Sequence, residues 1–168
     1  MYNGSASPPI ITNSTFSDNT ADYGGGIDNI QSNSTITNSI FWGNSAPFGS
    51  DIEYDRGSTS TITYTTLQVS YAGTGNSTAD PLFVDASNPA GADGIHRTAD
   101  DGLRLFSNSP AANTGNNNSI PSGITTDIIG SARTQNTTVN MGVYEDLTTV
   151  CSSTSALPTT AGTTYTAD

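Results

Sequence analysis

One short segment, SDIEYDRG at residues 50–57, brings together three carboxylates and an arginine. If the segment is a strand, Asp51, Glu53 and Asp55 share one face, because successive side chains point to opposite sides. Carboxylates beside a cation such as Arg56 can bind calcium or act as acid and base on a glycosidic bond. One segment does not form a cleft, however, and the chain has no lysine to serve as a base. A solvated outer face is therefore the preferred interpretation, and a ligand-binding site is the alternative.

A second acidic group lies in GADGIHRTADDG, residues 91–102. Asp93, Asp100 and Asp101 surround His96 in sequence, and carboxylates so close together allow a weak calcium site. His96 has no serine or cysteine nucleophile placed beside it, so we do not expect a catalytic triad. One histidine and one distant cysteine do not make a zinc site. We predict no catalytic residue, and calcium is the one cofactor that these residues suggest.

The composition limits the classes of partner. The chain has 168 residues, a formal net charge of −11 and no lysine. Because a phosphate backbone requires a basic surface, we predict no nucleic-acid partner. We also predict no transmembrane segment, since no apolar stretch approaches the ~18 residues that a membrane span requires. Short triplets rich in Ile, Thr and aromatic residues recur, which favours β-strands over disorder.

The strongest signal is an internal repeat. ITNSTFSDNTADYGGGI (11–27) and ITNSIFWGNSAPFGSDI (36–52) align at an offset of 25 without a gap, and nine of the seventeen positions are identical. A third, partial copy is ITYTTL (62–67), at an offset of 26. Apolar residues five apart fit neither a helix nor a long strand, but they fit very short strands joined by corners. A repeat of this length is typical of a solenoid.

We therefore predict an all-β, right-handed, single-stranded parallel β-helix with rungs of about 25 residues. A leucine-rich horseshoe is the nearest competitor, but these repeats lack its leucines. Equivalent residues would stack in columns: Ile11, Ile36 and Ile62; Phe16, Phe41 and Leu67; Ile27 and Ile52. Asn19 over Asn44 would form an amide ladder. Gly24 recurs as Gly49, which indicates a corner with positive φ, whereas Gly25 and Gly26 are expected to be merely tolerated.

The aromatic residues of the repeat separate into two kinds. Tyr23, Phe48, Trp42 and Tyr54 are candidates for exposed or half-exposed rings on the repeat corners. Tyr23 and Phe48 are equivalent in the two copies, so packing in the core or at a corner is the favoured use of that pair. Trp42 breaks the repeat, since Ser17 stands at its place in the first copy. Aromatic rings on a solenoid can stack on sugars, and Trp42 is the better candidate for such a contact.

Four blocks follow the repeats: DPLFVDA (80–86), LRLFSNSPAANTG (103–115), TDIIGSAR (126–133) and VNMGVYE (139–145). Together they resemble the C-terminal end of bacterial surface β-helix proteins of the choice-of-anchor Q family. The matching residues are Asp80, Pro81, Leu82, Phe83, Ser109, Pro110, Ala111, Gly115, Thr126, Asp127, Gly130, Arg133, Met141, Gly142, Tyr144 and Glu145. Asn113 and Asn140 stand where that family usually has Asp. The repeats also resemble the FxxN and GGxI repeats of polymorphic outer-membrane proteins.

The expected organisation has three parts. Residues 1–79 would form rungs, with repeats at 11–33, 36–58 and 62–67 and a loop at 68–79. Residues 80–146 would form terminal rungs and a C-terminal capping region that covers the open end of the solenoid. In that region Arg133 would pair with Asp127 or Glu145, or these charges would be solvated. Residues 147–168, rich in Thr and Ser, would be a linker to a missing module. A last β-strand or an edge-lying tail is the alternative for the first few of these residues.

The resemblance implies a secreted or outer-membrane-associated cell-surface protein of a bacterium, and we expect the chain to be part of a longer one. Its expected role is non-catalytic: an adhesin-like or structural β-helix, with glycans or surface proteins as partners. The alternative is a fragment of a pectate-lyase-like, carbohydrate-active enzyme whose catalytic rungs lie upstream. A stalk without a ligand is the third hypothesis.

Overall fold

The computed structural model describes residues 1–4 and 8–149. Its regular structure is almost entirely β, which confirms the predicted class; within the described residues the helical element is a single 3-10 turn, η1 (Asn117–Ser119). The same residues contain no helix long and apolar enough to cross a membrane. The predicted linker, apart from its first residues, lies outside the described part of the chain.

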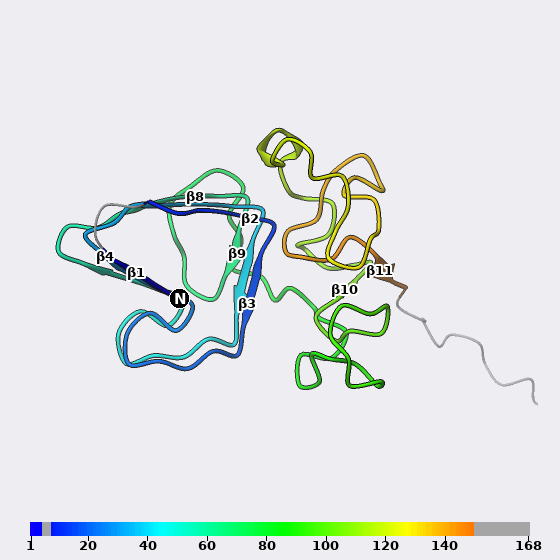
Figure 1. Cartoon of the computed structure of the whole chain (residues 1–168), viewed down its shortest axis with the longest axis horizontal. Helices are drawn as coiled ribbons and strands as arrows, with labels where there is room; N and C mark the ends of the chain where they lie inside the picture. The colour runs from blue at the N-terminus through cyan, green and yellow to red at the C-terminus, as the bar shows by residue number, and fades with distance from the viewer. Residues whose placement is uncertain (5–7, 150–168) are drawn as a thin grey trace, which may run out of the picture.

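The described part of residues 1–79 contains nine strands in three parallel sheets. The chain enters each sheet in turn and then returns to the first, and the sheets surround a common interior (Figure 1). The sheets are β1 (Tyr2–Gly4), β4 (Ile27–Ile30) and β7 (Ile52–Asp55); β2 (Ile10–Thr12), β5 (Ser34–Thr37) and β8 (Ser60–Thr63); and β3 (Thr15–Ser17), β6 (Ile40–Trp42) and β9 (Thr66–Leu67).

The register of these sheets confirms the predicted columns. Equivalent residues of successive copies are paired, and the paired side chains form one buried core. The pairs are Ile11 with Ile36, Ile36 with Ile62, Phe16 with Phe41, Phe41 with Leu67, and Ile27 with Ile52. The rings of Phe16 and Phe41 are stacked, with centroids 4.5 Å apart. A repeat of 25 residues therefore builds the core by pairing each apolar residue with the equivalent apolar residue of the next copy.

The predicted amide ladder is also present at a corner. The Asn19 side-chain amide donates to the Oδ1 of Asn44 at 2.9 Å, and the Asn19 backbone N–H donates to the same oxygen. Asn44 in turn donates to the Phe16 carbonyl at 2.9 Å. These bonds satisfy backbone groups that the turn leaves out of the ladder.

Left-handed residues recur at equivalent corners, because a chain that must turn three times per circuit needs backbone conformations outside the β region. Gly24 has φ +54° and Gly49 φ +63°, as predicted. The non-glycine examples follow the same spacing: Asn13, Asn38 and Tyr64 at one corner, and Gln31 and Arg56 at another.

The prediction that Gly25 and Gly26 are merely tolerated is wrong. A Cβ on Gly25 would lie 2.3 Å from the Ser50 carbonyl oxygen, and one on Gly26 would lie 2.7 Å from both the Asp51 carbonyl oxygen and the Phe41 ring. The first copy packs here against the backbone of the second. Both glycines are needed for that close approach.

The loop at residues 68–79 closes the end of the stacked sheets. Tyr71 packs against the core and donates its hydroxyl to the Ile52 carbonyl at 3.1 Å. Asn76 donates to the Ile62 carbonyl at 3.0 Å. Asp51 accepts the backbone N–H groups of Gln68 and Val69. The segment that breaks the repeat thus covers the exposed strand edges at the end of the stacked sheets.

The C-terminal region, residues 80–149, is arranged differently from the predicted terminal rungs and cap. Its strands are β10 (Leu105–Phe106) and β11 (Leu147–Thr148), which pair in parallel. The region lies beside the sheet of β3, β6 and β9 rather than over the end of the stack (Figure 1). Leu147 and Thr148, the first residues of the predicted linker, belong to this strand pair, so the alternative of a last β-strand is the one that holds for them.

The two regions are joined by apolar and polar contacts. Ile40, on the outer face of β6, packs with Leu105, Ala111 and Met141. The side chain of Asn38 holds the backbone of Asn116: its Oδ1 accepts from the Asn116 N–H at 2.7 Å, and its amide donates to the Asn116 carbonyl at 3.0 Å.

Candidate functional site

The outer face of the sheet β1–β4–β7 carries the strongest candidate site. Alternation along β4 and β7 directs Ile27, Asn29 and Ile52 inward and leaves Asp28, Glu53 and Asp55 on the outside. Asp28 and Glu53 are paired across the two strands. Neighbouring parallel strands lie about 4.8 Å apart, so negative charge is concentrated on this face.

Two aromatic rings border these carboxylates. Tyr23 and Phe48 are bridged at a corner and stacked, with ring centroids 5.1 Å apart and an interplanar angle of 12°. They are 54% and 55% exposed. A Cβ on Gly49 would lie 2.6 Å from a carboxylate oxygen of Glu53, so the missing side chain makes room for that group beside the rings. We call this surface, comprising Tyr23, Asp28, Phe48, Glu53 and Asp55, the acidic-aromatic face.

The acidic-aromatic face contains a cavity of about 310 Å³, lined by Tyr23, Asp28, Ile30, Glu53 and Asp55. Its chemistry combines an apolar surface with carboxylate oxygens that accept hydrogen bonds. That combination suits a sugar, whose ring C–H groups contact an aromatic face while its hydroxyls donate to carboxylates.

The structure separates the acidic residues that the sequence grouped together. Asp51 is buried at the corner, where desolvation raises its pKa although the N–H groups of Gln68 and Val69 lower it. Glu53 and Asp55 remain outside. Arg56 lies on the turn after β7, with its Nε 3.7 Å from an Asp55 carboxylate oxygen, and both side chains are mostly exposed. An exposed pair of this kind contributes little to stability.

Trp42 lies away from the acidic-aromatic face. It is half-buried against the apolar cluster that joins the two regions, and it lines a small cavity with Leu82, Phe83 and Phe106. Its departure from the repeat reflects packing against the C-terminal region. Tyr23 and Phe48, which sequence reasoning assigned to corner packing, are the exposed pair. Their place on the repeat corners allowed this exposure, but their equivalence in the two copies favoured packing.

The predicted calcium ligands are engaged within their own loop. Asp100 accepts from the Asp93 N–H at 3.0 Å, and hydrogen bonds from Thr98 and Asp93 lower the pKa of Asp100. Asp101 is buried and accepts from the N–H groups of Arg97 and Thr98. Within residues 1–4 and 8–149, no three His, Cys, Asp or Glu side chains are grouped so that they could hold a metal ion.

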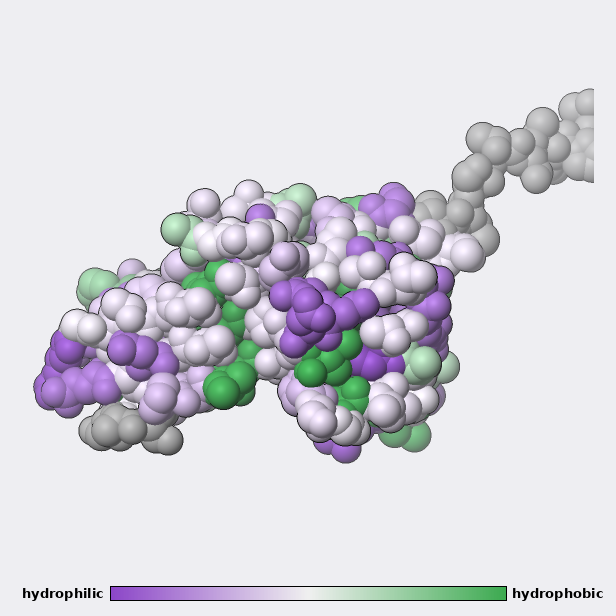
Figure 2. Space-filling model, turned by 90° about the horizontal axis from the view of Figure 1, so that it is seen from above, coloured by the Kyte–Doolittle hydropathy of each residue, from purple (hydrophilic) through white to green (hydrophobic). Residues whose placement is uncertain are grey.

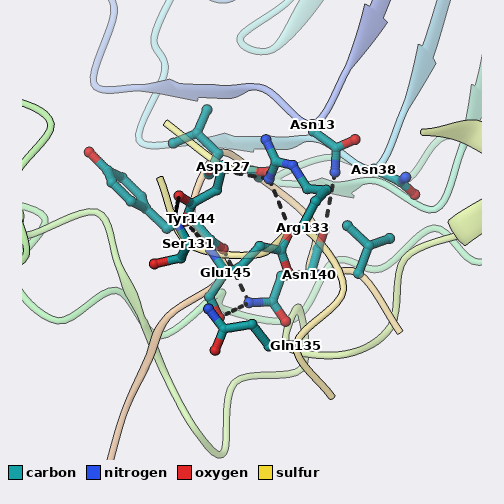
Figure 3. A network of polar contacts seen from close by, with 12 residues as sticks. Asn13, Asn38, Asp127, Ser131, Arg133, Gln135, Asn140, Tyr144 and Glu145 are labelled. Carbon is teal, nitrogen blue, oxygen red and sulfur yellow. Dashed lines mark hydrogen bonds and ion pairs between the residues drawn. The ribbon is translucent and has the colours of Figure 1, made fainter. Parts of the chain in front are cut away.

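The predicted charge pair of the C-terminal region is Arg133 with Glu145, at 2.9 Å, and both side chains are buried (Figure 3). Desolvation raises the pKa of Glu145 to about 7, although bonds from the Asn140 N–H and Arg133 lower it. Asp127 does not take this role. Its carboxylate accepts the backbone N–H groups of Ile129, Ser131 and Glu145.

This buried cluster connects three of the four sequence blocks. Asn140 Oδ1 accepts from the Asn113 N–H at 2.7 Å, and the Tyr144 hydroxyl donates to Asp101. The remaining block, DPLFVDA, is connected by Ser109, whose hydroxyl donates to the Pro81 carbonyl. The blocks that resemble a family signature are therefore contacts that hold one loop-rich body together.

Comparison with known proteins found no matching family model and no matching curated protein.

Proposed function

We propose that this chain is a segment of a secreted bacterial surface protein, and that residues 1–79 are part of a right-handed parallel β-helix. Two observations support the fold: the chain enters the three sheets in cyclic order, and equivalent residues pair in register. Connections between parallel strands are right-handed in nearly all proteins. The four C-terminal blocks support the proposed relation to the choice-of-anchor Q family.

The proposed role is a non-catalytic, adhesin-like spacer that binds glycan through the acidic-aromatic face. The observation that carries this proposal is the exposed stack of Tyr23 on Phe48 beside Asp28 and Glu53. Exposed aromatic rings that lie together form an apolar patch, and such patches can mark ligand-binding surfaces. A rigid stacked scaffold would hold the rings and carboxylates in fixed positions, which lowers the entropy cost of binding.

The test is a glycan microarray with the purified chain, followed by calorimetric titration of the best neutral oligosaccharide. The double variant Tyr23→Ser, Phe48→Ser should lose at least about tenfold in affinity. Stacking of a nucleobase on an aromatic side chain contributes roughly 1–3 kcal/mol, and we expect a sugar ring to stack on these rings with a comparable free energy. Val69→Ser, which removes an exposed apolar side chain elsewhere, should bind like the wild type.

Two outcomes would count against this proposal. If no glycan binds, or if the double variant binds like the wild type, the face is not a glycan site. The enzyme alternative places the catalytic rungs upstream, so it is tested with those rungs included: if such a protein releases unsaturated products from polygalacturonate in the presence of calcium, the enzyme hypothesis replaces the adhesin.

A further inference from the structure

The cavity of the acidic-aromatic face is lined by three carboxylates, and two of them have no cation beside them. Asp55 has an ion-pair partner in Arg56, whose Nε lies 3.7 Å from its carboxylate. Among the described residues, the carboxylates of Asp28 and Glu53 neither form an ion pair nor accept a hydrogen bond. Both line the cavity, so their oxygens are available to a ligand there.

The two unpaired carboxylates belong to neighbouring strands. Asp28 of β4 is paired with Glu53 of β7, and parallel strands lie about 4.8 Å apart. Like charges so close repel each other, and a cation bound between them would relieve that repulsion. The amino group of Met1 does not take this place, because it donates to the Gly26 carbonyl at 2.6 Å.

The surface next to the cavity adds little positive charge. Figure 2 shows hydrophilic surface at the end of the stacked sheets away from the C-terminal body, where the turns after β4 and β7 lie (Figure 1). Arg56, on the turn after β7, has a side chain that is 66% exposed. An exposed ion pair is weak, so a ligand cation can compete for Asp55 as well.

The aromatic stack is an independent observation that points to the same kind of ligand. Tyr23 lines the cavity, and Phe48 stacks on its ring. An ammonium group close to an aromatic ring is attracted by the electrons of the ring face. No three His, Cys, Asp or Glu side chains of the described residues could hold a metal ion together, so an organic cation fits this cavity better than calcium does.

A sugar with a free amine matches both halves of the face. Its ring C–H groups can contact Tyr23, while its ammonium group lies between the carboxylates of Asp28 and Glu53. An N-acetylated sugar has the same ring without the charge. A uronic acid carries the opposite charge, and a chain with a net charge of −11 repels it.

We propose that the acidic-aromatic face prefers glycans built from amino sugars with free amines over neutral and acidic glycans. This inference rests on the proposed glycan-binding function and specifies its ligand class. Stacking on the rings supplies affinity for sugars in general, and the unpaired carboxylates of Asp28 and Glu53 supply the preference for the amine.

The test is calorimetric titration of the complete chain, at about pH 6, with three tetrasaccharides: glucosamine, N-acetylglucosamine and galacturonic acid oligomers. The glucosamine tetramer should bind at least about fivefold more tightly than the N-acetylated tetramer, and the galacturonate tetramer should bind most weakly. Raising the salt concentration from about 0.05 M to about 0.5 M should remove most of this preference, since salt screens exposed charges.

Matched variants separate the two carboxylates from the charge of the whole chain. The double variant Asp28→Asn, Glu53→Gln should bind the two glucosamine-based tetramers equally, with the affinity for the N-acetylated one changed by less than about twofold. The control Asp18→Asn, Asp80→Asn removes two exposed carboxylates that do not line the cavity, and it should keep the preference. Circular dichroism melting checks that both variants are folded.

Equal binding of the two glucosamine-based tetramers by the wild type would overturn this inference and leave the glycan-binding function standing. Binding of no sugar at all would overturn both. The inference is also wrong if the control variant loses the preference as fully as the cavity variant does. Tetralysine is titrated in parallel, and if it binds as tightly as the glucosamine tetramer, the face recognises ammonium groups of any polymer rather than an amino sugar.

Discussion

The stacked sheets of residues 1–79 and the loop-rich body of residues 80–149 satisfy their backbone hydrogen-bonding groups in different ways. In the first, a repeated sequence lets each backbone group pair with the copy above or below, so a core of seven buried apolar residues is enough. In the second, the blocks do not repeat, and the regular structure among the described residues consists of two strands of two residues each and the 3-10 turn η1.

The second body compensates with side-chain bonds to the backbone. Asp127 alone accepts three backbone N–H groups, and Asn140 bonds to the backbone of three residues, Asn113, Tyr144 and Glu145. In the repeated region, backbone groups bond to the neighbouring copy and need few specific side chains. In the non-repeating body, a specific polar side chain must bond to the backbone at each turn. The stability of the stacked sheets should accordingly depend on apolar columns, and that of the body on buried polar groups.

Phe41→Ala should have the largest effect, because it removes a fully buried ring stacked between Phe16 and Leu67. We expect the free energy of unfolding to fall by about 3–5 kcal/mol. Urea denaturation followed by circular dichroism measures this. A loss under about 1 kcal/mol would show that the columns do not carry the stability of the sheets.

Arg133→Met should destabilise the C-terminal body by about 3 kcal/mol, since it leaves the Glu145 carboxylate buried without its partner. The double variant Arg133→Met, Glu145→Leu should recover most of that loss at pH 8, where the Glu145 carboxylate of the single variant is charged. Denaturation at pH 8 compares the two. If the single and double variants are equally unstable, the ion pair is not what the body depends on.

The stability of the same body should depend on pH through Glu145. Its pKa is raised by burial from 4.5 to about 7 in the folded protein, so its contribution is fully present below pH 4.5 and is lost as the pH rises to about 7. The wild type should lose roughly 2–3 kcal/mol more than Glu145→Gln between pH 4.5 and 8. Parallel slopes for the two proteins would contradict the raised pKa.

The smallest effect compares the two copies of the repeat. Gly25→Ala should cost about 2 kcal/mol, because its Cβ meets the Ser50 carbonyl oxygen at 2.3 Å. Ser50→Ala, at the equivalent position of the next copy, should change stability by less than about 0.5 kcal/mol. Thermal melting of both variants checks this asymmetry, and similar losses would mean that the two copies are packed alike.

Much of the first region was predictable, and the reason lies in particular pairs. The offset of 25 places Ile11 on Ile36 and Phe16 on Phe41, because parallel strands in register pair equivalent residues. The need for Gly25 and Gly26 was not predicted. Gly25 and Gly26 lie against the Ser50 and Asp51 carbonyl oxygens of the second copy. An alignment of two copies shows which residues are equivalent, but not which of them lie against a neighbouring backbone.

The candidate site was predictable only in part. Glu53 and Asp55 lie outside as expected, but Asp51 turns inward because the end loop supplies N–H donors to it. Trp42 is half-buried and Tyr23 exposed because the C-terminal body lies against one sheet and not another.

By itself, the sequence determined the strand class, the period and the register of the stacked sheets, since these follow from local spacing. It also narrowed the partner of Arg133 to two carboxylates. The tertiary structure alone decided the side on which the C-terminal body packs and the choice of Glu145 over Asp127. Those features depend on contacts such as Asn38 with Asn116, 78 residues apart, which no local pattern encodes.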